Sequence, residues 1–207
     1  MTVDDDENDG WNVVSVPRKK KKRNGPMETT QSVLQQDNNN SLEKATTTPF
    51  MMLLVGLPGS GKSTFAKSLE KGNRMKFTRI NQDQLGSRQA CLRVCQQVLE
   101  IRNCPIIDRC NFNSEQRESF IRMAQEYNMA IDCVIFNFSK DECIERCQSR
   151  SHHETIARGQ ERAVVSSLAK LLQNPSPRSN VFRTIHTIST NQQSNQLVLN
   201  YLNSLHE

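Results

Sequence analysis

An eight-residue segment, Gly56–Ser63, carries the residue types and the spacing that bind the phosphates of a nucleotide. Its glycines allow consecutive backbone N–H groups to turn inward at the amino end of a helix, where they form a site for anions. Lys62 would reach the terminal phosphates, and the hydroxyl of Ser63 would bind Mg²⁺, a cation that prefers oxygen ligands. The segment predicts ATP and Mg²⁺ as cofactors, and the predicted contacts are Gly56, Pro58, Gly59, Ser60, Gly61, Lys62, Ser63 and Thr64.

The sequence on either side of this segment supports the prediction. Residues 51–55 form an apolar run typical of a buried strand, and residues 63–70 favour a helix with Gly72 just beyond its end. A glycine-rich turn can also simply end a strand. Here all the fixed positions of the phosphate-binding pattern match and a strand precedes them, which favours nucleotide binding.

Two aspartates follow other predicted strands. Asp108 comes after Ile106 and Ile107, and a hydrophobic strand ending in an acid holds Mg²⁺ directly or through water in nucleotide-binding proteins. Asp83 lies after the predicted strand 77–80, where a carboxylate could take the proton of an acceptor hydroxyl. Each has a plainer alternative: Asp108 could cap a helix or lie in a loop, and Asp83 could cap the amino end of a helix.

The elements that must position these residues alternate along the chain. This alternation predicts an α/β, P-loop NTPase-type three-layer fold with a mostly parallel sheet of about five strands. Ligand groups in such sheets gather beyond the carboxyl ends of the strands. The predicted strands are 51–55, 77–80, 105–108, 130–138 and 181–188, the predicted helices are 63–70, 90–101, 114–127, 139–150, 159–172 and one from 191, and residues 81–86 are predicted as a loop.

Composition divides the 207 residues into two parts. Residues 1–48 are polar, with seven Lys or Arg against eight Asp or Glu, and we expect a disordered tail because so few apolar residues cannot offset the entropy of ordering. Residues 49–207, the predicted P-loop domain, carry 20 basic and 14 acidic residues, an excess that suits an acidic partner such as nucleic acid or a polyphosphate. The basic run Arg18–Arg23 is typical of a nuclear import signal or a nucleic-acid-binding arm, although such runs are also often simply solvated.

Other sequence features exclude several classes of protein. No apolar stretch is long enough for a membrane helix and the first residues are acidic, so we expect a soluble protein of the nucleus, or otherwise of the cytoplasm. The seven cysteines form no C-x-x-C pair, and two pairs spaced four apart predict buried, reduced thiols on helix faces rather than a metal site.

Three motifs together resemble the polynucleotide 5′-hydroxyl kinase family over about residues 50–190. They are the phosphate-binding segment with Thr64 and Phe65, Ile80-Asn81-Gln82-Asp83 with Leu85-Gly86-Ser87, and Ile107-Asp108-Arg109-Cys110-Asn111. The order and spacing of the motifs match those of the family as well as their residues do. The phosphate-binding segment alone would be unspecific, so the second and third motifs carry the resemblance.

The resemblance implies a role for each matched residue. Asp83 would be the general base on a 5′-hydroxyl of DNA or RNA, Lys62 a transition-state clamp, and Ser63 with Asp108 the metal site. Arg150 would close over the ATP phosphates, with Arg146 as a companion, although Arg146 could also be a surface residue with no role. Nucleic-acid ends are the implied partner of a monomeric repair enzyme, which could recruit repair proteins through its tail.

The sequence also departs from the family and leaves alternatives open. Many members have an arginine where this chain has Gln82, so one contact to the acceptor or to a phosphate would be weaker. No D-x-D-x-T phosphatase motif occurs in the sequence, so the resemblance implies the kinase activity alone. A small-molecule kinase of the gluconate or shikimate type would share the same loop and base, and a non-catalytic module that binds ATP and nucleic acid would share the loop.

Overall fold

The computed structural model describes residues 48–73, 76–149, 156–176 and 178–204. The predictions for the tail, including the basic run Arg18–Arg23, and for Arg150 fall outside these residues. Among the helices of the described residues, none is long and apolar enough to span a membrane.

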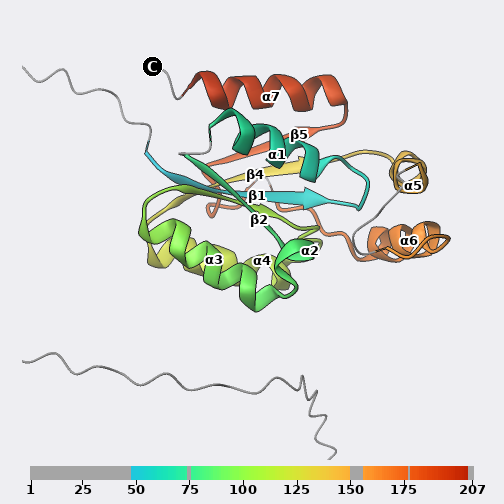
Figure 1. Cartoon of the computed structure of the whole chain (residues 1–207), viewed down its shortest axis with the longest axis horizontal. Helices are drawn as coiled ribbons and strands as arrows, with labels where there is room; N and C mark the ends of the chain where they lie inside the picture. The colour runs from blue at the N-terminus through green and yellow to red at the C-terminus, as the bar shows by residue number, and fades with distance from the viewer. Residues whose placement is uncertain (1–47, 74–75, 150–155, 177, 205–207) are drawn as a thin grey trace, which may run out of the picture. The chain divides into compact units, whose positions relative to one another are not determined.

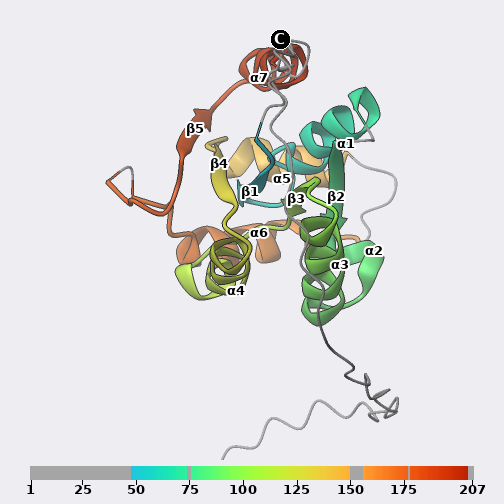
Figure 2. The same cartoon turned by 90° about the vertical axis from the view of Figure 1, so that its left-hand side faces the viewer.

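Five parallel strands form one sheet, as predicted. Their order across the sheet is β2-β3-β1-β4-β5, which Figure 2 shows along the strands. Because all five run the same way, their carboxyl ends lie at one edge. The strands are β1 (Phe50–Gly56), β2 (Phe77–Asn81), β3 (Cys104–Asp108), β4 (Ala130–Phe136) and β5 (Thr184–Ile188).

Helices cover both faces of this sheet. In Figure 1, α1 and α7 lie on one face, α3 and α4 on the other, and α5 and α6 beyond the carboxyl end of β1. The three-layer fold predicted from the alternation is therefore confirmed. The helices are α1 (Lys62–Gly72), α2 (Gln82–Leu85), α3 (Arg88–Glu100), α4 (Ser114–Glu126), α5 (Lys140–Gln148), α6 (Glu161–Leu171) and α7 (Asn191–Asn203).

The central strand β1 is buried along its whole length. Its side chains alternate between two cores, so Met52 and Leu54 pack with α1 and α7, while Met51 and Leu53 pack with α3 and α4. Burial on both faces explains why this strand is a continuous apolar run instead of an alternating one. The phosphate-binding segment thus starts from a fully buried strand at the centre of the sheet.

Some predicted boundaries are wrong. The segment 81–86 is not all loop, because the side chain of Asn81 accepts a hydrogen bond from the Gln84 N–H (3.1 Å) and begins the short helix α2. Gly86, with φ of 79°, ends this helix. The predicted strands 130–138 and 181–188 are shorter, since the pairing of β4 with β5 extends only from Asp132 to Phe136.

A buried carboxylate joins β4 to the segment before β5 and to α7. Asp132 is 1% exposed and accepts hydrogen bonds from Arg183 Nε (2.8 Å), Arg183 Nη2 (2.6 Å) and the Tyr201 hydroxyl (2.9 Å). The hydrogen bond to Asp132 raises the pKa of the Arg183 guanidinium, and burial raises that of Tyr201. The guanidinium also lies 4.4 Å from the centre of the Phe50 ring. These contacts hold the edge strand against the sheet.

We expect Asp132→Asn to lower the free energy of unfolding by about 2 kcal/mol, because it removes the charge from three hydrogen bonds while keeping the side-chain shape. Urea denaturation measures this change. Glu126→Gln is the matched control: it breaks the exposed Arg122–Glu126 pair (4.0 Å) and should cost less than about 0.5 kcal/mol. Equal effects of the two substitutions would contradict the role given to Asp132.

Candidate active site

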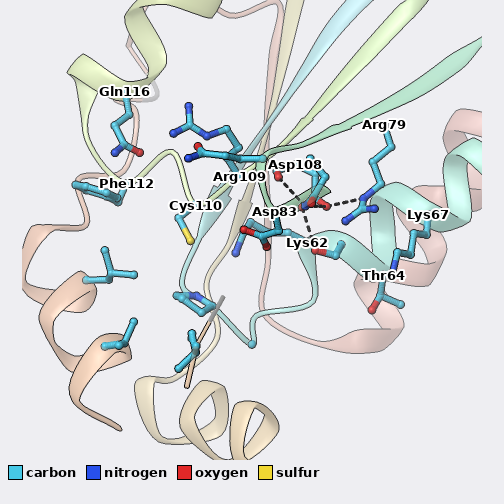
Figure 3. A pocket seen from close by; sticks show the side chains of 18 residues that line it. Lys62, Thr64, Lys67, Arg79, Asp83, Asp108, Arg109, Cys110, Phe112 and Gln116 are labelled. Atoms are coloured by element: carbon cyan, nitrogen blue, oxygen red, sulfur yellow. Dashed lines mark hydrogen bonds and ion pairs between the residues drawn. The ribbon is translucent and has the colours of Figure 1, made fainter. Parts of the chain in front are cut away.

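A cavity of about 610 Å³ lies where the carboxyl ends of β1, β2 and β3 meet. The phosphate-binding loop, the start of α1, the end of β2 with α2, and the segment after β3 form most of its wall, and α6 forms part of the rest. Figure 3 shows the side chains that point into it. The cavity brings together three residues predicted from separate motifs: Ser63, Asp83 and Asp108.

The phosphate-binding loop is held in shape by close packing. Gly59 has φ of 82°, and a Cβ atom there would overlap the carbonyl oxygen of Cys143 and lie 2.9 Å from Cys147 Sγ. Lys62 is 6% exposed, and its Nζ donates to the carbonyl oxygens of Gly56 (3.0 Å) and Leu57 (2.7 Å). The loop therefore holds its lysine in place with its own carbonyl groups.

Asp108 accepts hydrogen bonds through both of its carboxylate oxygens. Its Oδ1 accepts from Ser63 Oγ (3.2 Å), and its Oδ2 accepts from Arg79 Nε (2.6 Å) and Asn81 Nδ2 (3.1 Å). Asp108 lies in the last position of β3 and is 3% exposed, so neither a helix cap nor a loop position describes it. Ser63 Oγ and Asp108 Oδ1 are two oxygen atoms at the amino end of α1, a donor set that fits Mg²⁺.

Asp83 lies in the first turn of α2. The cap of this helix is Asn81, so the alternative that Asp83 is an amino-terminal cap is wrong. The side chain of Asp83 is exposed and lines the cavity, where Figure 3 shows it near Asp108 and Lys62. A carboxylate in this position can accept a proton from a hydroxyl that enters the cavity.

The rest of the cavity wall has two characters. Polar side chains line one part, and apolar side chains from α6, from the segment before α6 and from the segment after β3 line another. The polar group is Lys67, Arg79, Gln82, Arg109 and Gln116, and the apolar group is Phe112, Ile156, Val164 and Leu168. Burial lowers the pKa of Arg109. The side chain remains cationic at neutral pH because the ordinary pKa of arginine is far above 7.

Arg146 lines a second cavity of about 410 Å³, which Gly61 and Thr64 also line. Its guanidinium lies 4.4 Å from the centre of the Phe138 ring, and its Nη2 donates to Glu142 Oε1 (2.6 Å). The guanidinium also lies close to the phosphate-binding loop: a Cβ atom built on Gly61 would be 4.0 Å from Arg146 Nη1. Arg146 is therefore packed beside the phosphate-binding loop, and its role toward ATP stays a prediction.

The cysteines form no disulfide among the described residues. Both predicted helical pairs are buried, and they are Cys91 with Cys95 and Cys143 with Cys147. Burial raises the pKa of Cys95 to about 12 and that of Cys143 to about 11. No group of three or more His, Cys, Asp or Glu side chains in the described part of the chain is arranged to hold a metal ion.

Sequence reasoning assigned no role to several residues that line the cavity. Arg79 and Asn81 bond to Asp108, and Lys67, Arg109, Phe112 and Gln116 also line the cavity wall. One signal was available: Arg79 is a charged residue between Phe77 and Ile80 in a strand, and such a residue needs a partner when the strand is buried. Nothing in the sequence identified that partner as Asp108.

The loop, the acid at the end of β3 and the parallel sheet define a P-loop domain of the kinase type. Residues 51–175 match the model of the AAA domain family AAA_33, and the chain belongs to this family.

Two curated relatives match parts of the chain. The bHLH140 transcription factor of Arabidopsis thaliana is 33% identical over 129 residues, which cover 60% of this chain and 14% of that protein. The bifunctional polynucleotide phosphatase/kinase of Schizosaccharomyces pombe is 33% identical over 93 residues, which cover 44% of this chain and 22% of that protein. The chain thus spans less than a quarter of the length of each. The second relative confirms the resemblance to polynucleotide kinases.

Solved structures share the fold. Kti12 of Chaetomium thermophilum, in complex with ADP-AlF3, has a TM-score of 0.57 at 14% identity, covering 75% of this chain and 98% of that one. A fungal RNA kinase has a TM-score of 0.54 at 18% identity, and the match covers 76% of this chain and 83% of that one. A gluconokinase of Sinorhizobium meliloti has a TM-score of 0.52 at 18% identity, and the match covers 77% of this chain and 93% of that one. These similarities confirm the P-loop fold and leave the acceptor open.

We expect Gly59→Ala to weaken ATP binding at least about tenfold, because an added Cβ collides with the backbone of α5 and a positive φ is strained for alanine. Gly86→Ala is the matched control, since Gly86 has a similar φ of 79° with no atom within 4 Å of an added Cβ. Calorimetric titration with ATP compares the two. If both variants bind ATP like the wild type, the packing of the loop against α5 does not support its shape.

Proposed function

We propose that this domain transfers the γ-phosphate of ATP to the 5′-hydroxyl end of a nucleic acid. One observation carries the choice of acceptor: the cavity that contains Asp83 has a cationic wall and an apolar wall. A polynucleotide end offers matching groups, namely a sugar hydroxyl, phosphates and a base with an apolar face. A sugar acid such as gluconate has no group that would use the apolar wall.

The residues of the cavity suit phosphoryl transfer. Such a reaction needs charge compensation and alignment more than covalent chemistry. Lys62 would exchange its carbonyl contacts for the terminal phosphates, and Asp83 would accept the proton of the attacking hydroxyl. Ser63 and Asp108 Oδ1 would hold Mg²⁺, which neutralises charge on the phosphate oxygens when bound.

The nucleoside part of ATP would lie in the second cavity. Arg146 and Asn191 line that cavity beside the phosphate-binding loop, and Arg146 Nη2 donates to Asn191 Oδ1 (3.1 Å). A planar guanidinium suits contact with a base or a phosphate. Arg150 remains a proposed contact to the ATP phosphates.

The cell role of the domain is a further part of this proposal. The relationship to a bifunctional polynucleotide phosphatase/kinase favours a role in making nucleic-acid ends that a ligase can use. The basic run Arg18–Arg23 favours import into the nucleus, where the tail would meet repair proteins.

The direct test is transfer of labelled γ-phosphate from ATP with Mg²⁺ to 5′-hydroxyl oligonucleotides, with DNA and RNA in parallel. We expect label on the 5′ end of at least one polymer, and Asp83→Asn should lower transfer at least about a hundredfold while ATP binding is nearly unchanged, because only the base is lost. Lys62→Ala should weaken nucleotide binding as well. Transfer at the wild-type rate by Asp83→Asn would exclude Asp83 as the base.

Two negative results point to other functions. ATP binding with no label on either polymer, but with phosphorylation of gluconate, would assign a small-molecule kinase. ATP binding with salt-dependent binding of oligonucleotides and no transfer would assign a non-catalytic module, since phosphate contacts release counterions.

The apolar wall has a test of its own. We expect Phe112→Ala to raise the KM for the oligonucleotide about tenfold with little change in kcat, because a base stacked on an aromatic ring gains on the order of 1–3 kcal/mol. Phe112→Tyr keeps the ring and should behave like the wild type. Steady-state kinetics on a fixed oligonucleotide measures both variants. An unchanged KM in Phe112→Ala would show that the acceptor does not contact this wall.

A further inference from the structure

Arg79 is a buried cation at the end of the cavity where Mg²⁺ would bind. Its side chain is 5% exposed, and its Nε donates to Asp108 Oδ2 at 2.6 Å. Its backbone N–H donates to Glu70 Oε1 (2.9 Å), which ties this part of β2 to α1. Figure 3 shows Arg79 reaching Asp108 from the side of Thr64 and Lys67.

The three donors to Asp108 leave little of its charge for a metal ion. Arg79 and Asn81 occupy Oδ2, and the Ser63 hydroxyl donates to Oδ1. The side chains of Asp108 and Arg79 are 2% and 5% exposed, so water screens their pairing very little. The carboxylate is therefore already neutralised by a fixed arginine.

The remaining charges of the cavity also oppose a free cation. Four basic side chains line it, and they are Lys62, Lys67, Arg79 and Arg109. The acidic side chains that line it are Asp83 and Asp108. A divalent cation that enters alone would meet an excess of positive charge and one carboxylate that is already paired. A triphosphate brings negative charge and oxygen ligands, and reverses that balance.

We propose that Arg79 makes metal binding conditional on the nucleotide: by pairing with Asp108 it keeps a free divalent cation out, so that the metal enters only as the magnesium nucleotide. Arg79 is thus a positioning residue that acts through Asp108. The inference rests on the nucleotide binding of the proposed function and is independent of the acceptor. Its test contains no acceptor, so it can fail while the polynucleotide assignment stands.

The experiment measures binding of Mn²⁺ alone by electron paramagnetic resonance, in the full chain without nucleotide. We expect little binding by the wild type, and a gain in affinity of at least about tenfold in Arg79→Gln, because Asp108 recovers its charge. Lys67→Gln is the matched control: it removes one positive charge from the same cavity, but Lys67 is not one of the donors to Asp108. It should remain close to the wild type.

Two further variants separate the charge of Arg79 from its shape. Arg79→Lys keeps the positive charge and should exclude Mn²⁺ as the wild type does. The double variant Arg79→Gln with Asp108→Asn should lose the new site, because its carboxylate ligand is gone. Retention of the site in the double variant would place the bound ion elsewhere and overturn the proposal.

Other outcomes would also overturn it. An Arg79→Gln variant that binds Mn²⁺ no better than the wild type, or a Lys67→Gln variant that gains as much, would remove the special role of Arg79. Tight binding of free Mn²⁺ by the wild type would contradict the proposal whatever the variants do. This last comparison needs no substitution, so it holds even if Arg79→Gln does not fold.

Discussion

The site depends on the hydrogen bonds that converge on Asp108. Donors come from the start of α1 (Ser63) and from β2 (Arg79 and Asn81), while Asp108 itself ends β3. These elements lie far apart in the sequence, and the parallel register, which pairs Asn81 with Asp108, brings them together. A buried carboxylate is costly unless it is fully bonded, so the sheet and the site stabilise each other.

The segment that follows Asp108 joins the remaining walls. Asn111 is fully buried with φ of 46°, its Nδ2 donates to the carbonyl oxygen of Leu54 (2.7 Å), and its own carbonyl accepts from Arg117 (2.9 Å). Arg117 also donates to the carbonyl oxygen of Gln173 beyond α6 (2.8 Å). This short connection therefore links β1, α4 and the segment after α6 to the strand end that carries Asp108, and it supplies Phe112 to the apolar wall. Asn111 is a structural residue of the motif that contains Asp108.

Local patterns in the sequence predicted much of this arrangement. The phosphate-binding loop and the alternation of elements identified the fold, and the helix predicted from residue 139 begins at Lys140, with Ser139 as its cap. The pairing of Arg79 with Asp108 could not be predicted, because it depends on the order of the strands. The combination of a polar and an apolar cavity wall could not be predicted either, because it depends on how α6 packs. The short helix α2 was missed since four residues are too few to show helical periodicity. Long-range pairing decides such details.

The two cavities share the phosphate-binding loop, and Gly59 and Thr64 line both. One contains Arg146 and the start of α7, and the other contains Asp83 and the apolar wall. Phosphoryl transfer requires the attacking and leaving oxygens to lie roughly in line across the phosphate. In the proposed function ATP occupies one cavity and the acceptor the other, an arrangement that is compatible with this requirement. Because the loop itself is common to related folds, the side chains around the second substrate must decide which hydroxyl is phosphorylated.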